Sequence, residues 1–122
     1  MLTSYYAIHG SHVDAVAISA VVPSFYKGRR CTKLSPNYSI FSEWKSTKDN
    51  DRFTYRFGEE VLSGLDPNEV YSELGDNAIL LCYEKPNDFC HRHLVASWLM
   101  RNIPHLIIQE ATSTTRSGFQ FY

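Results

Sequence analysis

The segment Ala78–Tyr83 reads AILLCY, a continuous apolar run between the polar pairs Asp76-Asn77 and Lys85-Pro86. A short run with no alternation of polar residues is typical of a strand that is buried on both faces. Such strands usually belong to parallel sheets that are covered by helices. This segment therefore predicts an α/β domain in which it is an inner strand.

Further strands are expected toward both ends of the chain, with helices between them. Residues that favour β-structure predict strands over Thr3–Ile8, Val13–Val22 and His105–Gln109. A helix over Phe89–Asn102 is expected directly after the inner strand. This order predicts one three-layer α/β domain over residues 1–110, with a mostly parallel sheet and helices on both faces. Residues 111–122, rich in Ser and Thr, are expected to form a C-terminal tail.

Three helices are expected between residues 35 and 75. Ser35-Pro36 is a helix start signal, because Pro is favoured at the first helical position and Ser just before it. Asp66-Pro67 is a second such signal, and Gly75 ends the helix that it starts. Large apolar residues recur between them at helical spacing, namely Tyr38, Phe41, Trp44, Phe53, Phe57, Val61 and Leu65. Residues 23–36 show no such period and are expected to form a long irregular loop.

The composition is that of an ordinary globular protein. The chain has 122 residues, 43% of them hydrophobic, and a net charge of -1. These values argue against disorder. The net charge does not indicate a nucleic-acid-binding protein, and only a local basic patch gives such binding weak support. The longest apolar stretch, Ala15–Val22, is far shorter than the roughly 20 residues that a membrane-spanning helix needs. We therefore expect no membrane association.

The cysteines indicate a reducing compartment. Cys31, Cys82 and Cys90 cannot all pair within one chain, and a low, odd count is typical of free thiols. No basic segment precedes an apolar stretch in the manner of a secretory signal. We expect a cytoplasmic protein with free thiols, and the aromatic residues of the tail leave room for a homodimer.

The start of the helix after the inner strand gathers reactive side chains. Asn87 or Asp88 is expected to cap this helix, which places Cys90 and His91 in its first turn. The positive end of the helix dipole favours a thiolate or a bound anion there. The thiol of Cys90, beside His91 and Arg92, is therefore expected to have a lowered pKa and to act as a nucleophile.

The neighbouring residues complete a candidate catalytic site. At about 100° per residue, His91 faces the buried side of the helix and His93 faces solvent. Glu84, where the inner strand ends, is placed to orient His91 or to act as a base. The expected roles are a nucleophile at Cys90, an acid/base pair at Glu84 and His91, and an anion holder at Arg92.

Structural and metal-binding interpretations of these residues stay open. Cys90 also fits a small buried hydrophobe, and His91 fits a core histidine bonded to a backbone carbonyl. Arg92 and Glu84 also fit a local ion pair. The ligand types for a metal are present at Cys82, Glu84, Cys90, His91 and His93. However, positions 91 and 93 lie about 200° apart on a helix, so we assign no metal ligands and no cofactor.

A second candidate site is the basic stretch after Phe25-Tyr26. It contains Lys27, Arg29, Arg30 and Lys33, four positive charges in seven residues. A solvated surface loop accounts for such a stretch, and so does a clamp for phosphate, whose oxygens match the fork of a guanidinium. If this loop lies on the same rim as Cys90, one ligand can contact both the Cys90 site and the loop, with an anionic group at each.

The stretch from Leu80 to Leu94 resembles the signature of the family catalogued as domain of unknown function 488, with its C-x-E…C-H-R core. The similarity extends to Thr3-Ser4-Tyr5, Ile18-Ser19 with Pro23, Lys33-Leu34-Ser35-Pro36, Trp44-Lys45 and Val61-Leu62. It implies a small α/β protein with a site at Glu84, Cys90, His91 and Arg92, and it implies no particular reaction. Many members carry a D-V-R-x-x-P motif where this chain has Ala17-Ile18-Ser19-Ala20, so a mechanism that relies on its Asp and Arg is not expected here.

Three functional hypotheses follow from these observations. The first is an enzyme, or an enzyme-like domain, acting on a small anionic ligand that is nucleotide-like or otherwise phosphorylated. The second is a non-catalytic module that binds a nucleotide or nucleic acid through residues 27–33. The third is a metal-binding protein.

Overall fold

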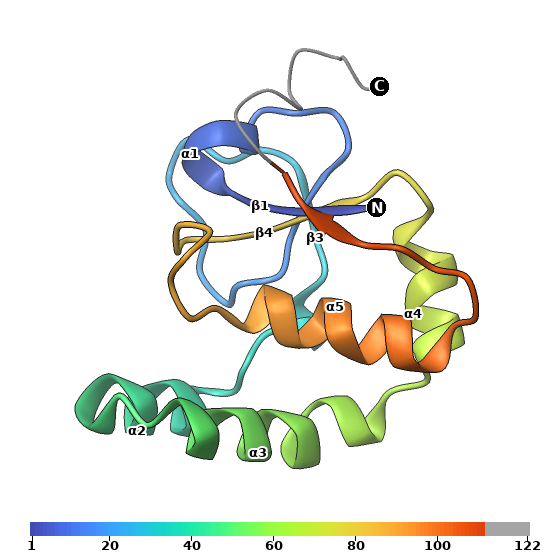
Figure 1. Ribbon diagram of the computed structural model, residues 1–122. Helices are drawn as coiled ribbons and strands as arrows, with labels where there is room; N and C mark the ends of the chain where they lie inside the picture. Colours follow the sequence, from blue (N-terminus) through green and yellow to red (C-terminus); the bar gives the residue numbers. More distant parts are fainter. Residues whose placement is uncertain (112–122) are drawn as a thin grey trace.

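The computed structural model describes residues 1–111, which form a parallel sheet with helices (Figure 1). The strands are β1 (Leu2–Tyr5), β2 (Ala15–Ala17), β3 (Arg29–Arg30), β4 (Ile79–Cys82) and β5 (Gln109–Glu110). They lie in the order β3-β2-β4-β1-β5, and each neighbouring pair is parallel. The predicted α/β class is confirmed, with the AILLCY segment as the middle strand.

Strand β4 is buried on both faces, as its continuous apolar pattern predicts. Leu80 points to one side, where it packs in the larger hydrophobic core with Val16 of β2. Ile79 and Leu81 point to the other side and pack in a smaller core with Tyr6. The alternation follows from the two-residue period of a strand. The helices cover the first side, and the second side is covered more thinly.

Four helices cover the side of the sheet that Leu80 faces. They are α2 (Tyr38–Thr47), α3 (Asn50–Glu60), α4 (Pro67–Leu74) and α5 (His91–Asn102). Figure 1 shows α5 next to the sheet, with α2 and α3 on the far side of α5. The opposite side carries the single turn α1 (Tyr6–His9) and Tyr26 from the loop after β2. Within residues 1–111, none of the helices combines the length and the apolar character needed to cross a membrane.

Several predicted boundaries are wrong by a few residues. The strand expected over residues 3–8 ends at Tyr5, and α1 follows it. The strand expected over residues 13–22 is limited to Ala15–Ala17, because the chain turns where Ser19 Oγ donates to the carbonyl of Val21. The strand expected over residues 105–109 is instead Gln109–Glu110. Of the predicted tail, Ala111 donates its amide to Thr3, and residues 112–122 lie outside the described part.

The expected long loop contains regular structure. Its residues form the edge strand β3 and a 3-10 turn, η1 (Thr32–Leu34). The next helix is capped by Asn37 rather than by Ser35, because the Asn37 side chain accepts from the amide of Ile40. The other predicted signals act as expected: Asp66 caps α4, and Gly75 ends it with a φ of 85°, which favours glycine.

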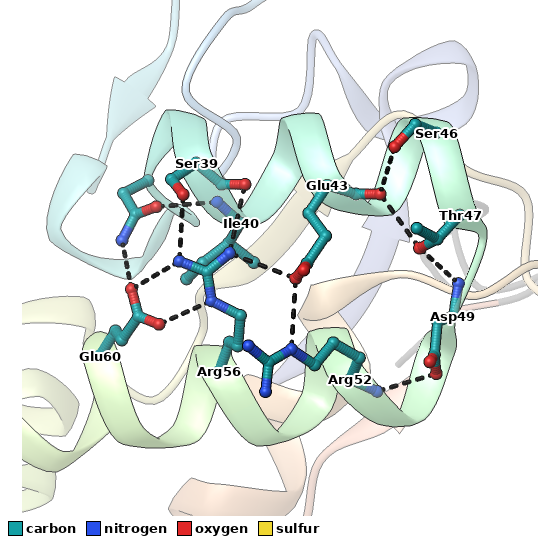
Figure 2. Close-up of polar contacts among 10 residues, drawn as sticks. Ser39, Ile40, Glu43, Ser46, Thr47, Asp49, Arg52, Arg56 and Glu60 are labelled. Carbon is teal, nitrogen blue, oxygen red and sulfur yellow. Dashed lines mark hydrogen bonds and ion pairs between the residues drawn. The ribbon is translucent and has the colours of Figure 1, made fainter.

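Arg56 links α3 to α2 through polar contacts, which are drawn in Figure 2. Its guanidinium donates to both carboxylate oxygens of Glu60 on its own helix. It also donates to Glu43 and to Ser39, which both lie on α2. This network joins α2 to α3, and α2 supplies one wall of the cavity described below.

Candidate functional site

A cavity of about 320 Å³ lies beyond the carboxyl ends of β2 and β4. Ligands bind in this position in open parallel sheets. Tyr38, Phe41 and Trp44 of α2 form an aromatic wall, so the residues that predict the helix also line the cavity. The remaining lining residues are Ser19, Ala20, Val21, Pro36, Phe53, Cys82, Tyr83, Glu84, Phe89, Cys90 and His91. The lining is mostly apolar and aromatic, and its reactive groups are concentrated where β4 ends and α5 begins.

Two of the lining residues are joined by a disulfide bond. Cys82 is the last residue of β4, and Cys90 is the N-cap of α5. Their sulfur atoms are bonded, and both side chains are buried. The expectation of free thiols is therefore wrong for this pair, while Cys31 is free and buried. The predicted caps Asn87 and Asp88 are also wrong, because α5 begins only at His91.

Arg92 is completely buried and lies next to Cys82. Its Nη1 donates to Sγ of Cys82 at 3.2 Å and to the main-chain carbonyl of Glu84 at 2.7 Å. Its Nε and Nη2 donate to the two carboxylate oxygens of Glu110 at 3.1 and 2.9 Å. Arg92 is absent from the cavity lining, and its ion pair is with Glu110 rather than with Glu84. The guanidinium therefore contacts Sγ of Cys82 and the carboxylate of Glu110 and does not form part of the cavity lining.

Glu110 compensates the buried charge of Arg92. Its carboxylate also accepts from Thr3 Oγ1 at 2.5 Å and lies 3.1 Å from Nε2 of His93. Burial alone would raise the pKa of Glu110, but the hydrogen bonds with His93, Arg92 and Thr3 outweigh burial and hold the pKa at about 2. This carboxylate therefore stays charged near neutral pH. It fixes the orientation of Arg92 and joins β5 to α5.

His91 is buried and neutral. Its Nε2 lies 2.7 Å from the main-chain carbonyl oxygen of Ile18. Because a carbonyl oxygen only accepts, Nε2 carries the proton and Nδ1 keeps its lone pair. Burial lowers the pKa of His91 to about 4, and the nearby positive charge of Arg92 acts in the same direction. The side chain faces the interior, as the helical arithmetic predicts, and it is a weak base near neutral pH.

Glu84 contributes to the site in two ways. Its main-chain carbonyl accepts from Arg92, which fixes the turn after β4. The residue is half-buried and lines the cavity. Among the described hydrogen bonds, none joins its side chain to His91, whose Nε2 is instead bonded to Ile18. Glu84 therefore lines the cavity and contacts Arg92 through its main chain, and its side chain has no described bond to His91.

The four basic residues of the second candidate site do not share one set of partners. Arg29 donates to the carbonyls of Glu73 and Leu74 at the end of α4, and Lys33 pairs with the Glu73 carboxylate at 2.6 Å. Arg30 instead donates to the carbonyl of Ala20, which lines the cavity. Lys27 is exposed. Of this group, Arg30 has the described contact nearest to the cavity.

Two parts of the site were not predicted. The pairing of Cys82 with Cys90 has a signal in the sequence, because Cys82 stands at a strand end close to the start of the next helix. Glu110 carries no local signal, because it reaches Arg92 only when β5 lies next to β1.

Comparison with protein families identifies a match over most of the chain. The family model DUF488-N3a, described as the active DUF488-N3 subclade, matches residues 20–103. This range includes Cys82, Cys90, His91 and Arg92. Comparison with curated proteins and with solved structures gives no match.

Proposed function

The chain belongs to the DUF488-N3a family, and on this premise we propose that it is an enzyme that uses a cysteine thiol at the Cys82–Cys90 site. The description of the subclade as active supports catalysis. The observation that carries the proposal is the hydrogen bond from buried Arg92 to Sγ of Cys82, beside a cavity that both sulfurs line. In the reduced pair, the Nη1–H of Arg92 stabilises a thiolate on Cys82 by donating a hydrogen bond to it, while Glu110 balances the charge of the guanidinium.

The reactive form in this proposal is the reduced pair. In a reducing compartment, which is the expectation for this chain, cellular thiols keep such cysteines as dithiols. Cys90 is then the nucleophile, because it lines the cavity and occupies the N-cap position of α5, at the positive end of the helix dipole. Cys82 is the second thiol, held by Arg92. In the disulfide form of the structure, the sulfur of Cys90 is bonded to Cys82 and carries no thiol, so this nucleophile is absent.

Proton transfer in this proposal belongs mainly to Glu84. The two members of the predicted acid/base pair, Glu84 and His91, differ in their capacity for proton transfer. His91 has a pKa of about 4 and binds protons poorly near pH 7. Glu84 lines the same cavity as Cys90. It is therefore placed to accept or return a proton at the reacting atoms of a ligand. His91 supplies a neutral imidazole beside them.

The lining of the cavity supports a ligand with a flat aromatic part. Trp44 stacks on Phe89 with ring centroids 5.9 Å apart, and Tyr38 and Phe41 extend the aromatic wall outward. Such walls bind nucleobases by stacking, which contributes roughly 1–3 kcal/mol per base. Arg30, which reaches Ala20 on the cavity lining, is the candidate partner for a phosphate. We therefore propose a small nucleotide-like ligand, with its base inside and its anionic group toward Arg30.

Alkylation of the reduced protein tests the role of the thiol. The protein is reduced with a phosphine, held in EDTA and treated with iodoacetamide over a range of pH, and each cysteine is followed by peptide mass spectrometry. We expect Cys90 to react at least about tenfold faster than Cys31 at pH 7, with a labelling midpoint below the value of about 8.5 for free cysteine. Cys31 is the internal control, because burial raises the pKa of its thiol.

A Cys82→Ser variant completes this experiment. It cannot form the disulfide, so the labelling rate of Cys90 is measured without competition from reoxidation. Slow labelling of Cys90 that does not change with pH, in both the original chain and this variant, would exclude a nucleophile. The cavity would then belong to a non-catalytic binding module.

A further inference from the structure

The two sulfurs and His91 form a cluster that the proposed thiol chemistry does not fully use. Sγ of Cys82, Sγ of Cys90 and a ring nitrogen of His91 all lie within 4.8 Å of one another, and the three residues are buried. They come from the end of β4 and the start of α5, two elements packed in the same core. We propose that the reduced protein binds a single Zn²⁺ through these three side chains.

The donor set fits Zn²⁺ in chemistry and in spacing. Thiolate and imidazole are preferred zinc ligands, with Zn–S near 2.3 Å and Zn–N near 2.0 Å. Ligand atoms of a tetrahedral site are therefore roughly 3.5 Å apart, within reach of small side-chain rotations from a cluster of this size. Three protein ligands leave a fourth position vacant, as in catalytic zinc sites. All three residues line the cavity, so the fourth position opens into it.

The surroundings of the cluster match those of metal ligands. A histidine that binds a metal usually donates its other ring N–H to a carbonyl or a carboxylate. His91 donates Nε2–H to the carbonyl of Ile18, which leaves the lone pair of Nδ1 for an ion. Cys82 already accepts a hydrogen bond from Arg92, as ligating thiolates do from nearby donors. Since Glu110 compensates Arg92, Zn²⁺ with two thiolates adds no net charge to the buried site.

The disulfide and the zinc site exclude each other. A phosphine and a water molecule convert the disulfide to two thiols and a phosphine oxide. Binding of Zn²⁺ then replaces the two thiol protons, which pass to the buffer. A bound ion also masks the nucleophile of Cys90, so this inference goes beyond the proposed function and describes a different state of the same sulfurs.

Metal titration of the full chain tests the inference. The phosphine-reduced protein is freed of reductant without air and titrated with Zn²⁺ against a chromophoric chelator, and with Co²⁺ to detect thiolate-to-metal charge transfer. We expect one bound ion per chain in the reduced protein and none in the oxidised protein. Cys82→Ser and Cys90→Ser should each lose about a hundredfold or more in affinity, beyond the cost of losing an outer-shell partner.

A Cys31→Ser variant is the matched control, because Cys31 is free, buried and outside the cluster. It should bind Zn²⁺ like the original chain. The inference is overturned if the reduced protein binds no ion, or if Cys90→Ser binds as tightly as Cys31→Ser. Because the alkylation experiment uses EDTA, rapid labelling of Cys90 with no Zn²⁺ binding would overturn this inference and leave the proposed function intact.

Discussion

A Glu110→Ala variant is expected to lose about 3 kcal/mol of its free energy of unfolding, the largest effect that we expect of a single polar residue. The substitution leaves the guanidinium of Arg92 completely buried with no carboxylate to compensate its charge. Breaking a buried ion pair in this way typically costs about 3–5 kcal/mol. The lower end applies because the Glu110 side chain keeps 22% of its surface exposed. Urea unfolding at pH 7, followed by tryptophan fluorescence, measures the loss.

Two further variants separate the buried charge from a general effect of the substitution. Glu73→Ala removes a carboxylate that pairs with Lys33 on the surface, so it should change stability far less. Arg92→Met in the Glu110→Ala background should recover part of the loss, because it removes the uncompensated charge. Equal free energies of unfolding for Glu110→Ala and Glu73→Ala would show that the ion pair between Arg92 and Glu110 does not stabilise the native protein.

Acid is expected to destabilise the protein by about 3 kcal/mol between pH 6.5 and pH 4 through His91. The unfolded chain takes up a proton on this imidazole near pH 6.5, whereas the native protein keeps it neutral down to about pH 4. The unfolded state therefore binds more protons in this range, and the free energy of unfolding falls as the pH falls. Glu110 adds a second decline between about pH 4.5 and 2, because its pKa is lowered in the native state.

A His91→Gln variant isolates the first decline. The glutamine amide is able to donate to the carbonyl of Ile18 but does not titrate, so the slope between pH 6.5 and 4 should flatten. His105→Asn, at an exposed position, is the matched control and should keep the slope. Urea unfolding at several pH values measures both. An unchanged slope in His91→Gln would mean that another group causes the acid sensitivity.

The inner strand was predictable because burial on both faces leaves a simple signal in the sequence. Ile79 and Leu81 meet one core and Leu80 meets the other, so no polar residue interrupts the run. The edge strand β3, in contrast, was not predictable from its own residues. Its residues, Arg29 and Arg30, are charged and exposed, as is common for strands that must avoid pairing with other chains. Local composition there resembles a loop, and only the pairing with β2 makes a strand of it.

The site was predictable where its residues are close in sequence. Cys90, His91 and Arg92 follow one another at a helix start, and Glu84 lies shortly before them, in the segment that joins β4 to this helix. The role of Arg92 was not predictable, because its partner Glu110 is 18 residues away and meets it through the pairing of β5 with β1. The aromatic wall had a signal that fits two structures. Spacing by three residues predicts a helix face but does not say whether that face meets a core or a cavity.

Protection of Cys90 by a nucleotide tests whether the cavity and the sulfur pair form one site. The phosphine-reduced protein is alkylated in EDTA with and without adenosine monophosphate, and labelling is followed at each cysteine. A Phe41→Ala variant removes part of the aromatic wall. Tyr55→Ala is its control, because Tyr55 is an exposed aromatic residue outside the cavity lining.

The account predicts that the nucleotide slows labelling of Cys90 and leaves Cys31 unchanged. Phe41→Ala should raise the nucleotide concentration needed for protection by at least about fivefold, the lower limit for loss of one stacking contact, whereas Tyr55→Ala should not. Labelling of Cys90 at the same rate with and without the nucleotide, in a protein that remains folded, would contradict it.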